Sequence, residues 1–134
     1  MNAKNNYYNN AKDNFKIWID DGIIKISTGK GKWTIETMAR CMEEFNELNK
    51  KLPKNQKVLI DVSLTPSTPT AAFRKEMISI IAKTFRSSRV KKVAIWGGST
   101  LVKVVISFFI TAIRIKNIQH FKAEEEALKW LKED

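Results

Sequence analysis

The sequence predicts a single α/β domain in which one mixed sheet of about five strands is covered by about four helices. The chain has 134 residues, of which 43% are hydrophobic and 28% charged, and this composition suits one globular domain. Apolar runs rich in β-branched residues alternate with segments of helical period. Two strands come first, then helices and strands in turn. Strands separated by single helices are expected to pair in parallel.

The first strands form a predicted hairpin. Phe15–Asp20 alternates apolar and polar residues, and the β-rich run Ile23–Ser27 follows the turn Asp20-Asp21-Gly22. Residues 1–14, rich in Asn and Lys, are expected to be a flexible tail without the apolar run of a secretion signal, so the domain spans residues 15–134.

The first helix is expected to begin after Thr34, as N-cap, and to end before Pro53. Trp33 and Met38 are placed to form a hydrophobic staple across this start. The apolar residues at helical spacing are Ile35, Met38, Met42, Phe45, Leu48 and Leu52. The next strand, Lys57–Ser63, has the continuous apolar run of a strand covered on both faces.

Two more helix-strand pairs and a last helix follow. The second helix has Thr68 or Thr70 as its cap and reaches about Arg86, before the strand Val93–Trp96. The third helix, from Thr100 to about Arg114, is apolar except for a stripe of Lys103, Ser107, Thr111 and Arg114, so it must be covered over most of its circumference. The chain closes with the strand Asn117–Phe121 and the helix Ala123–Glu133.

Cysteine content and hydropathy bear on the compartment. Cys41 is the one cysteine, so no internal disulfide can form, and we expect a reducing compartment, the cytoplasm. Val93 to Ile113 holds a single charge, Lys103, in 21 residues. The Gly97-Gly98-Ser99-Thr100 interruption argues against one membrane-spanning helix.

Positive charge is concentrated in the middle of the chain. The formal net charge is +10, and residues 77–123 contain nine basic residues and no acidic one. This basic zone consists of Lys83, Arg86, Arg89, Lys91, Lys92, Lys103, Arg114, Lys116 and Lys122. Such a zone suits an anionic membrane surface or an acidic protein, or is a solvated rim. Nucleic acid is not the expected partner, because no glycine-aromatic or zinc motif accompanies the charge.

Several segments together resemble the SpoIIAA-like group of the STAS superfamily, the anti-sigma-factor-antagonist and sulfate-transporter domains. They are the opening hairpin, the strands Val58–Asp61 and Lys92–Ile95, and the ending Ile118–Phe121 followed by Glu125–Leu131. The resemblance covers Phe15 to Glu133, and its most specific part is the closing Ala-Leu-Lys-Trp-Leu segment. It implies a SpoIIAA-like fold and a non-enzymatic binding or regulatory module, without a cofactor, that recognises a protein partner or a small apolar or anionic ligand.

In regulatory members of that group, a serine in an Asp-Ser-Ser-Gly-like turn after the central strand is phosphorylated to break partner binding. The corresponding turn here offers Ser67 and Thr68 but lacks the neighbouring acid and glycine. Ser67, Thr68 and Thr70 are therefore candidates for ligand or phosphate binding at a helix N-terminus, with plain helix caps as the alternative.

Other candidate residues follow the next strand. Gly97, Gly98, Ser99 and Thr100 form a second helix entrance that could receive an anion, with Lys103 one turn further on; the alternative is a tight turn with a hydroxyl cap. A hydrolase built on Ser99 and His120 is a rival hypothesis, although no Gly-x-Ser-x-Gly elbow is present. No metal site is expected, since His120 has no second His or Cys near it.

Asp61 and the third helix complete the candidates. Asp61, at the end of a buried strand, is expected to accept backbone N–H groups of the following turn. The third helix has more apolar residues than one sheet face can cover, and Val105, Phe108 and Phe109 are its candidate contacts. Core packing, a homodimer and an apolar pocket or lipid contact remain open, so the alternative function is a peripheral lipid- or apolar-ligand-binding protein that uses this helix and the basic zone.

Overall fold

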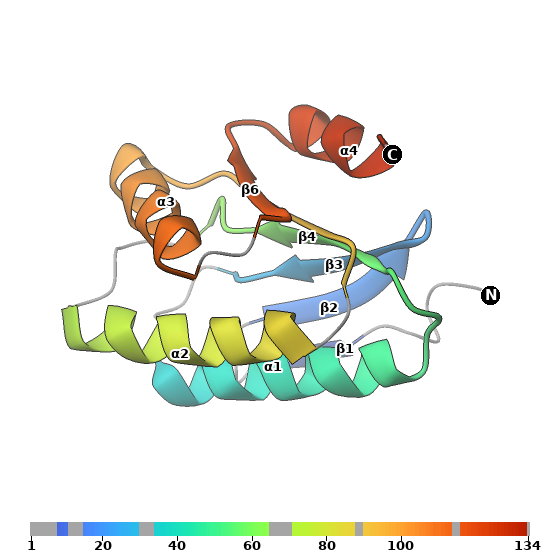
Figure 1. Cartoon of the computed structure of the whole chain (residues 1–134), viewed down its shortest axis with the longest axis horizontal. Coiled ribbons are helices and arrows are strands. Elements are labelled where there is room, and N and C mark those ends of the chain that lie inside the picture. The colour runs from blue at the N-terminus through green and yellow to red at the C-terminus, as the bar shows by residue number, and fades with distance from the viewer. Residues whose placement is uncertain are drawn as a thin grey trace.

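A computed structural model of the chain describes residues 8–10, 15–29, 34–64, 71–87, 90–113 and 116–133. The strands are β1 (Tyr8–Asn10), β2 (Phe15–Asp20), β3 (Ile23–Ser27), β4 (Lys57–Asp61), β5 (Lys92–Trp96) and β6 (Ile118–Phe121). The helices are α1 (Ile35–Lys50), α2 (Ala71–Ser87), α3 (Thr100–Ile113) and α4 (Glu124–Lys132). The predicted α/β class, with one mixed sheet and four helices, is confirmed for the described residues (Figure 1).

The strands lie in the sheet in their order along the chain, β1-β2-β3-β4-β5-β6. β1, β2 and β3 pair antiparallel, and the pairs from β3 to β6 are parallel. One strand was not anticipated. The short β1 lies in the segment assigned to the flexible tail, where it extends the sheet by pairing Tyr8–Asn10 with Phe15–Ile17 of β2.

The sequential strand order decides which face each helix covers. The connections through α1, α2 and α3 each lead from one strand to its neighbour in the same direction across the sheet. Because such crossovers are right-handed, all three helices lie on one face of the sheet. Figure 1 shows α1 and α2 side by side on that face, with α3 at its far end and α4 on the opposite face. The sheet is therefore covered unequally, by three helices on one face and one on the other.

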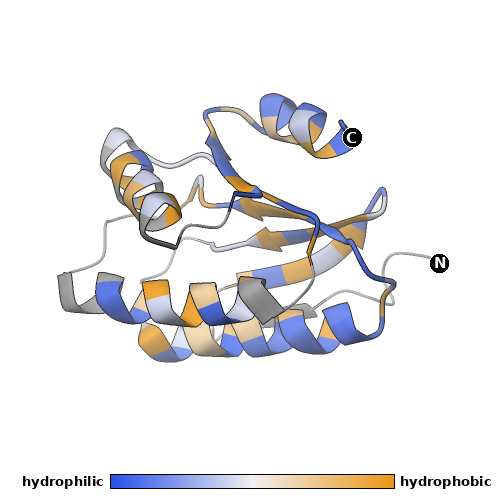
Figure 2. Ribbon diagram, in the orientation of Figure 1, coloured by the Kyte–Doolittle hydropathy of each residue, from blue (hydrophilic) through white to orange (hydrophobic). Residues whose placement is uncertain are grey.

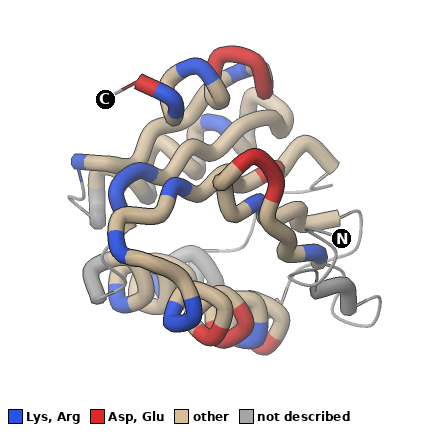
Figure 3. Tube along the Cα trace, turned by 90° about the vertical axis from the view of Figure 1, so that its right-hand side faces the viewer, with Lys and Arg blue, Asp and Glu red and all other residues tan. Residues whose placement is uncertain are grey.

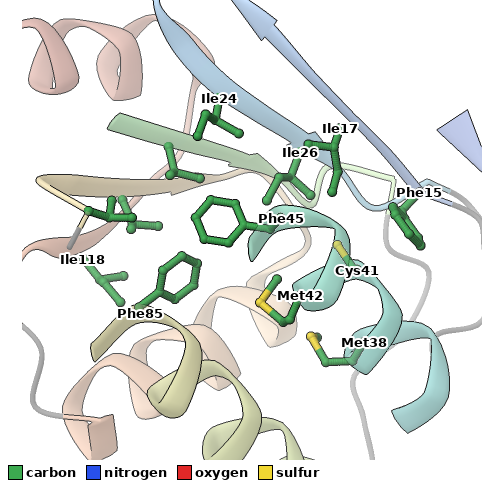
Figure 4. Packing of buried hydrophobic residues seen from close by; sticks show 13 residues of the cluster. Phe15, Ile17, Ile24, Ile26, Met38, Cys41, Met42, Phe45, Phe85 and Ile118 are labelled. Atoms are coloured by element: carbon green, nitrogen blue, oxygen red, sulfur yellow. The ribbon is translucent and has the colours of Figure 1, made fainter. Parts of the chain in front are cut away.

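The larger core lies between the sheet and the three helices. Figure 4 shows the rings of Phe45 (α1) and Phe85 (α2), whose centroids are 5.4 Å apart, packed below the strands. Its buried members include Phe15, Ile17, Ile24, Ile26, Met38, Cys41, Met42, Phe45, Val58, Phe85, Val93 and Ile118. The residues Met38, Met42 and Phe45 predicted for the inner face of α1 are buried.

The opposite face carries a smaller core under α4. Ala127 and Leu131 of α4 are fully buried against Ile23, Leu59 and Ala94 of the strands. Lys92, at the start of β5, fixes the C-terminal end of α4: its Nζ donates to the carbonyls of Trp130 and Glu133, each at 2.7 Å, and lies 4.8 Å from the centroid of the Trp130 ring.

Local signals in the sequence explain the turns and caps. The hairpin turn has positive φ at both Asp21 and Gly22, the type I′ geometry that an Asp-Gly pair favours. Thr34 caps α1 as predicted, with its Oγ1 accepting the Thr37 N–H at 3.1 Å. The predicted staple residue Trp33 and the predicted caps of α2 lie outside the described residues. Ala123 provides no side-chain cap for α4.

Candidate functional site

The carboxyl ends of the parallel strands meet at one edge of the sheet, where open α/β sheets commonly bind ligands. The turn after β5 reaches this edge through Gly97 and Gly98, with φ of +93° and +88°. A Cβ on Gly97 would lie 2.8 Å from the Cα of Ser63, so this glycine lets two loops touch. The N–H of Gly97 donates to the carbonyl of Phe121 at 3.2 Å. The turn is thus held between β4 and β6.

Asp61 and Thr28 hold the neighbouring loops. As predicted, Asp61 caps its own turn, with Oδ1 accepting the Ser63 N–H at 2.8 Å. The buried Thr28 donates both its N–H and its hydroxyl to the carbonyl of Asp61, at 3.1 and 3.2 Å. These side chains stabilise the edge by hydrogen bonds within the protein.

The five candidate residues of the second helix entrance lie together at the start of α3. The Oγ of Ser99 accepts the Val102 N–H at 3.3 Å, so this hydroxyl caps α3. Thr100 and Lys103 are exposed on the first turn. Gly97 and Gly98 thus form a tight turn, and Ser99 caps the helix with its hydroxyl, as the alternative interpretation expected.

His120, on β6, contributes to the same turn. Its Nε2 lies 3.1 Å from the carbonyl oxygen of Gly97. Because a carbonyl can only accept, Nε2 donates the hydrogen in this contact. The hydrogen bonds of Ser99 and His120 join them to Val102 and Gly97 and not to each other, so the pair is not arranged as the Ser99–His120 hydrolase hypothesis requires.

The remaining candidates are a buried cysteine and three hydroxyl residues outside the described part of the chain. Cys41 is buried in the larger core, and burial raises the pKa of its thiol to about 12. Within the described residues, no group of three or more His, Cys, Asp or Glu is placed to hold a metal ion. Ser67, Thr68 and Thr70 lie outside the described residues.

The outer side of α3 is unusual among the surfaces of the described residues, because it exposes large apolar side chains. Val104 and Phe108 are each 59% exposed, and with Leu64 at 46% they are the exposed large hydrophobic residues of the described chain. Figure 2 shows hydrophobic residues on the visible side of α3, whereas that side of α1 is largely hydrophilic. We call the exposed pair Val104 and Phe108 the α3 ridge. In the part of the chain that the structure describes, no helix has the length and hydropathy needed to cross a membrane.

The coverage expected for the apolar residues of α3 is incomplete. Phe108, a candidate contact residue, is exposed, and so is the stripe of Lys103, Ser107 and Thr111. The side chains of Val105 and Phe109 lie outside the description. Val104, one of the apolar residues in excess of what one sheet face can cover, is exposed as well, and its spacing of four residues from Phe108 places the two on one side of the helix.

Three lysines are exposed on α3 or next to a strand that it contacts. Lys103 precedes Val104 on α3, and Lys116 and Lys122 lie before and after β6. Lys92, another residue of the basic zone, instead donates hydrogen bonds to the carbonyls of Trp130 and Glu133 in α4 and its C-cap. Figure 3 shows Lys and Arg on several elements, while Asp and Glu colour only a few short runs.

Comparisons with known proteins identify a family but no activity. A protein-family model described as a domain of unknown function, DUF7793, matches residues 17–133. A search of curated proteins finds no match to the chain.

Proposed function

We propose that this chain, which belongs to the DUF7793 family, is a non-catalytic binding module of the SpoIIAA-like type that recognises its partner through the exposed side of α3. The resemblance to the STAS superfamily supports a binding or regulatory role and suggests a protein partner or a small ligand. In this proposal the module works in the cytoplasm, where a lone cysteine stays reduced.

The polar groups at the sheet edge support a role without catalysis. Among the described residues there, Asp61, Ser99 and His120 are candidates for an acid, a base or a nucleophile. Each of them makes a hydrogen bond that fixes a loop: Asp61 to Ser63, Ser99 to Val102 and His120 to Gly97. These groups shape the edge and present α3.

The α3 ridge is the observation that carries the proposal. Large apolar side chains exposed together on a small domain mark contact surfaces, because their hydration is unfavourable. Val104 and Phe108 are adjacent on one helix and are each more than half exposed. The ridge is convex, so it suits a broad partner surface better than a small apolar ligand, which binds in a concave site.

Site-specific photocrosslinking inside the cells that express the protein tests this proposal without assuming what the partner is. A photoreactive phenylalanine analogue replaces Ser107, which is exposed between Val104 and Phe108, or Glu47, which is exposed on α1. We expect adducts from position 107 and few from position 47. The combined Val104→Ser and Phe108→Ser changes should remove the adducts at 107. Equal adducts at both positions, or none at 107, would contradict the proposal.

The candidate phosphorylation turn needs its own test. Incubation with kinase and separation on a phosphate-affinity gel should show whether Ser67 or Thr68 is modified. A Ser67→Ala/Thr68→Ala variant with unchanged partner binding would assign these residues to helix capping alone.

A further inference from the structure

The α3 ridge points directly away from the protein. Val102 and Ile106 are buried, and Ile110, four residues on, packs against the larger core. Two residues along a helix correspond to a rotation of about 200°, so Val104 and Phe108 lie opposite the buried side chains. The ridge therefore lies on the side of α3 that faces away from the sheet.

The chain segment that contains the ridge carries charge of one sign. α3 carries Lys103 and no acidic residue, and residues 77–123, which include α3, β6 and most of α2, contain no Asp or Glu. Lys103, Lys116 and Lys122 are all exposed. A partner that contacts the ridge meets apolar side chains next to the positive charge of Lys103, so an anionic partner is electrostatically complementary.

The charge and shape narrow the choice of partner. A second copy of this chain, with the same net charge of +10, would bring like charges together across the ridge. An acidic protein would need a groove to receive a convex ridge. An anionic bilayer needs no such groove, because apolar side chains enter the acyl boundary while lysines stay at the headgroups.

We infer that α3 lies flat on an anionic lipid surface, with Val104 and Phe108 inserted and Lys103, Lys116 and Lys122 facing the lipid phosphates. This inference rests on the proposed role of α3 as the recognition surface and names what that surface contacts. The protein remains peripheral, since the inserted groups come from one side of one helix.

Vesicle co-sedimentation of the full chain tests the inference. The vesicles contain phosphatidylcholine alone or with about one third phosphatidylserine. We expect binding to the anionic vesicles that weakens as salt is raised, and little binding to phosphatidylcholine alone. Phe108→Ser should weaken binding about tenfold or more, because an exposed aromatic group no longer enters the bilayer. Lys103→Glu should weaken it by a similar factor, through loss of one favourable charge and gain of an unfavourable one.

Two variants serve as matched controls. Leu64→Ser removes an exposed hydrophobic residue outside α3, and Lys54→Glu makes the same charge change on the exposed turn between α1 and β4. Both should bind anionic vesicles as the unchanged chain does. Losses equal to those of Phe108→Ser and Lys103→Glu would overturn the inference, as would equal binding to both kinds of vesicle.

A fluorescence measurement reports the insertion itself. A polarity-sensitive thiol dye on Ser107→Cys should shift to the blue with anionic vesicles, whereas the same dye on Glu47→Cys should not. Cys41 does not interfere, because it is buried and its raised pKa keeps it protonated. An unshifted spectrum at position 107 would overturn the inference. Protein adducts at 107 in the crosslinking experiment, without vesicle binding, would preserve the proposed function and replace the lipid by an acidic protein.

Discussion

Replacing Gly97 by alanine should destabilise the fold far more than replacing Gly22, although both glycines have positive φ. Gly22 has φ of +74° and no atom within 4 Å of an added Cβ. Gly97 has φ of +93°, and an added Cβ would lie 2.8 Å from both Cα and Cβ of Ser63 and 2.9 Å from its N. The backbone strain is similar at the two sites, so the difference between them isolates the contact with Ser63.

The structure sets the size of the effect. An L-residue at such a φ costs about 1–2 kcal/mol, partly offset by about 0.4–1 kcal/mol from the reduced freedom of the unfolded chain. Gly22→Ala should therefore cost about 1 kcal/mol or less. At Gly97 the backbone of Ser63 must also move, and overpacking of this kind adds about 1–3 kcal/mol. We expect Gly97→Ala to lower the free energy of unfolding by about 2–4 kcal/mol.

Urea unfolding followed by tryptophan fluorescence measures both variants against the unchanged chain. Trp96 immediately precedes Gly97, so the probe also reports on the strand that the turn terminates. The slope of the free energy against urea should stay the same while the midpoint falls. A free-energy difference below about 0.5 kcal/mol between the two variants would show that the Gly97–Ser63 contact does not constrain the turn.

Three further predictions concern the core and one surface pair. Phe45→Ala should lower the free energy of unfolding by about 3–5 kcal/mol in the same urea assay, because it removes a fully buried ring that packs on Phe85; a loss below 1 kcal/mol would contradict that packing. Cys41 should react with a thiol reagent at pH 8 only as fast as the protein opens, since burial raises its pKa to about 12, so rapid labelling without urea would refute its burial. The hydrogen bond and charge of Lys25 lower the pKa of Asp20 below its ordinary value of 3.8. The ion pair of Asp20 with Lys25 therefore stabilises the fold above pH 3.8, and this stabilisation is lost as the pH falls through the lower pKa of the folded state. Between pH 2 and 5 the melting temperature should fall less for Asp20→Asn than for the unchanged chain, and parallel curves would contradict the lowered pKa.

The helices and the central strands could be predicted because their signals are local. The spacing of Met38, Met42 and Phe45 fixes the inner side of α1, and Thr34 marks its start. The apolar runs at Val58 and Val93 are those of strands covered on both faces, and the structure buries both residues completely. In each case, the residues that decide the structure are neighbours in the sequence.

Features that depend on distant pairing could not be predicted from the sequence. β1 has little apolar alternation and exists only by pairing with β2, so it was assigned to the tail. The contact of His120 with Gly97 depends on the alignment of β5 with β6, in which Ile95 lies opposite His120. Lys92 belongs to a charged run in the sequence, but the fold directs it to carbonyls about forty residues away.

The position of α3 at the end of its layer does not by itself explain its exposed apolar residues. α1 also has a helix on one flank only, α2, and its outward residues include the exposed Glu36, Glu43 and Glu47. The fold thus tolerates a polar exterior on an outer helix, and solubility favours one. At the other end of the same layer, α3 instead exposes Val104 and Phe108. Because packing requires no such residues there, we propose an external contact as the physical reason for them, and the adjacent Lys103 favours a contact of negative charge.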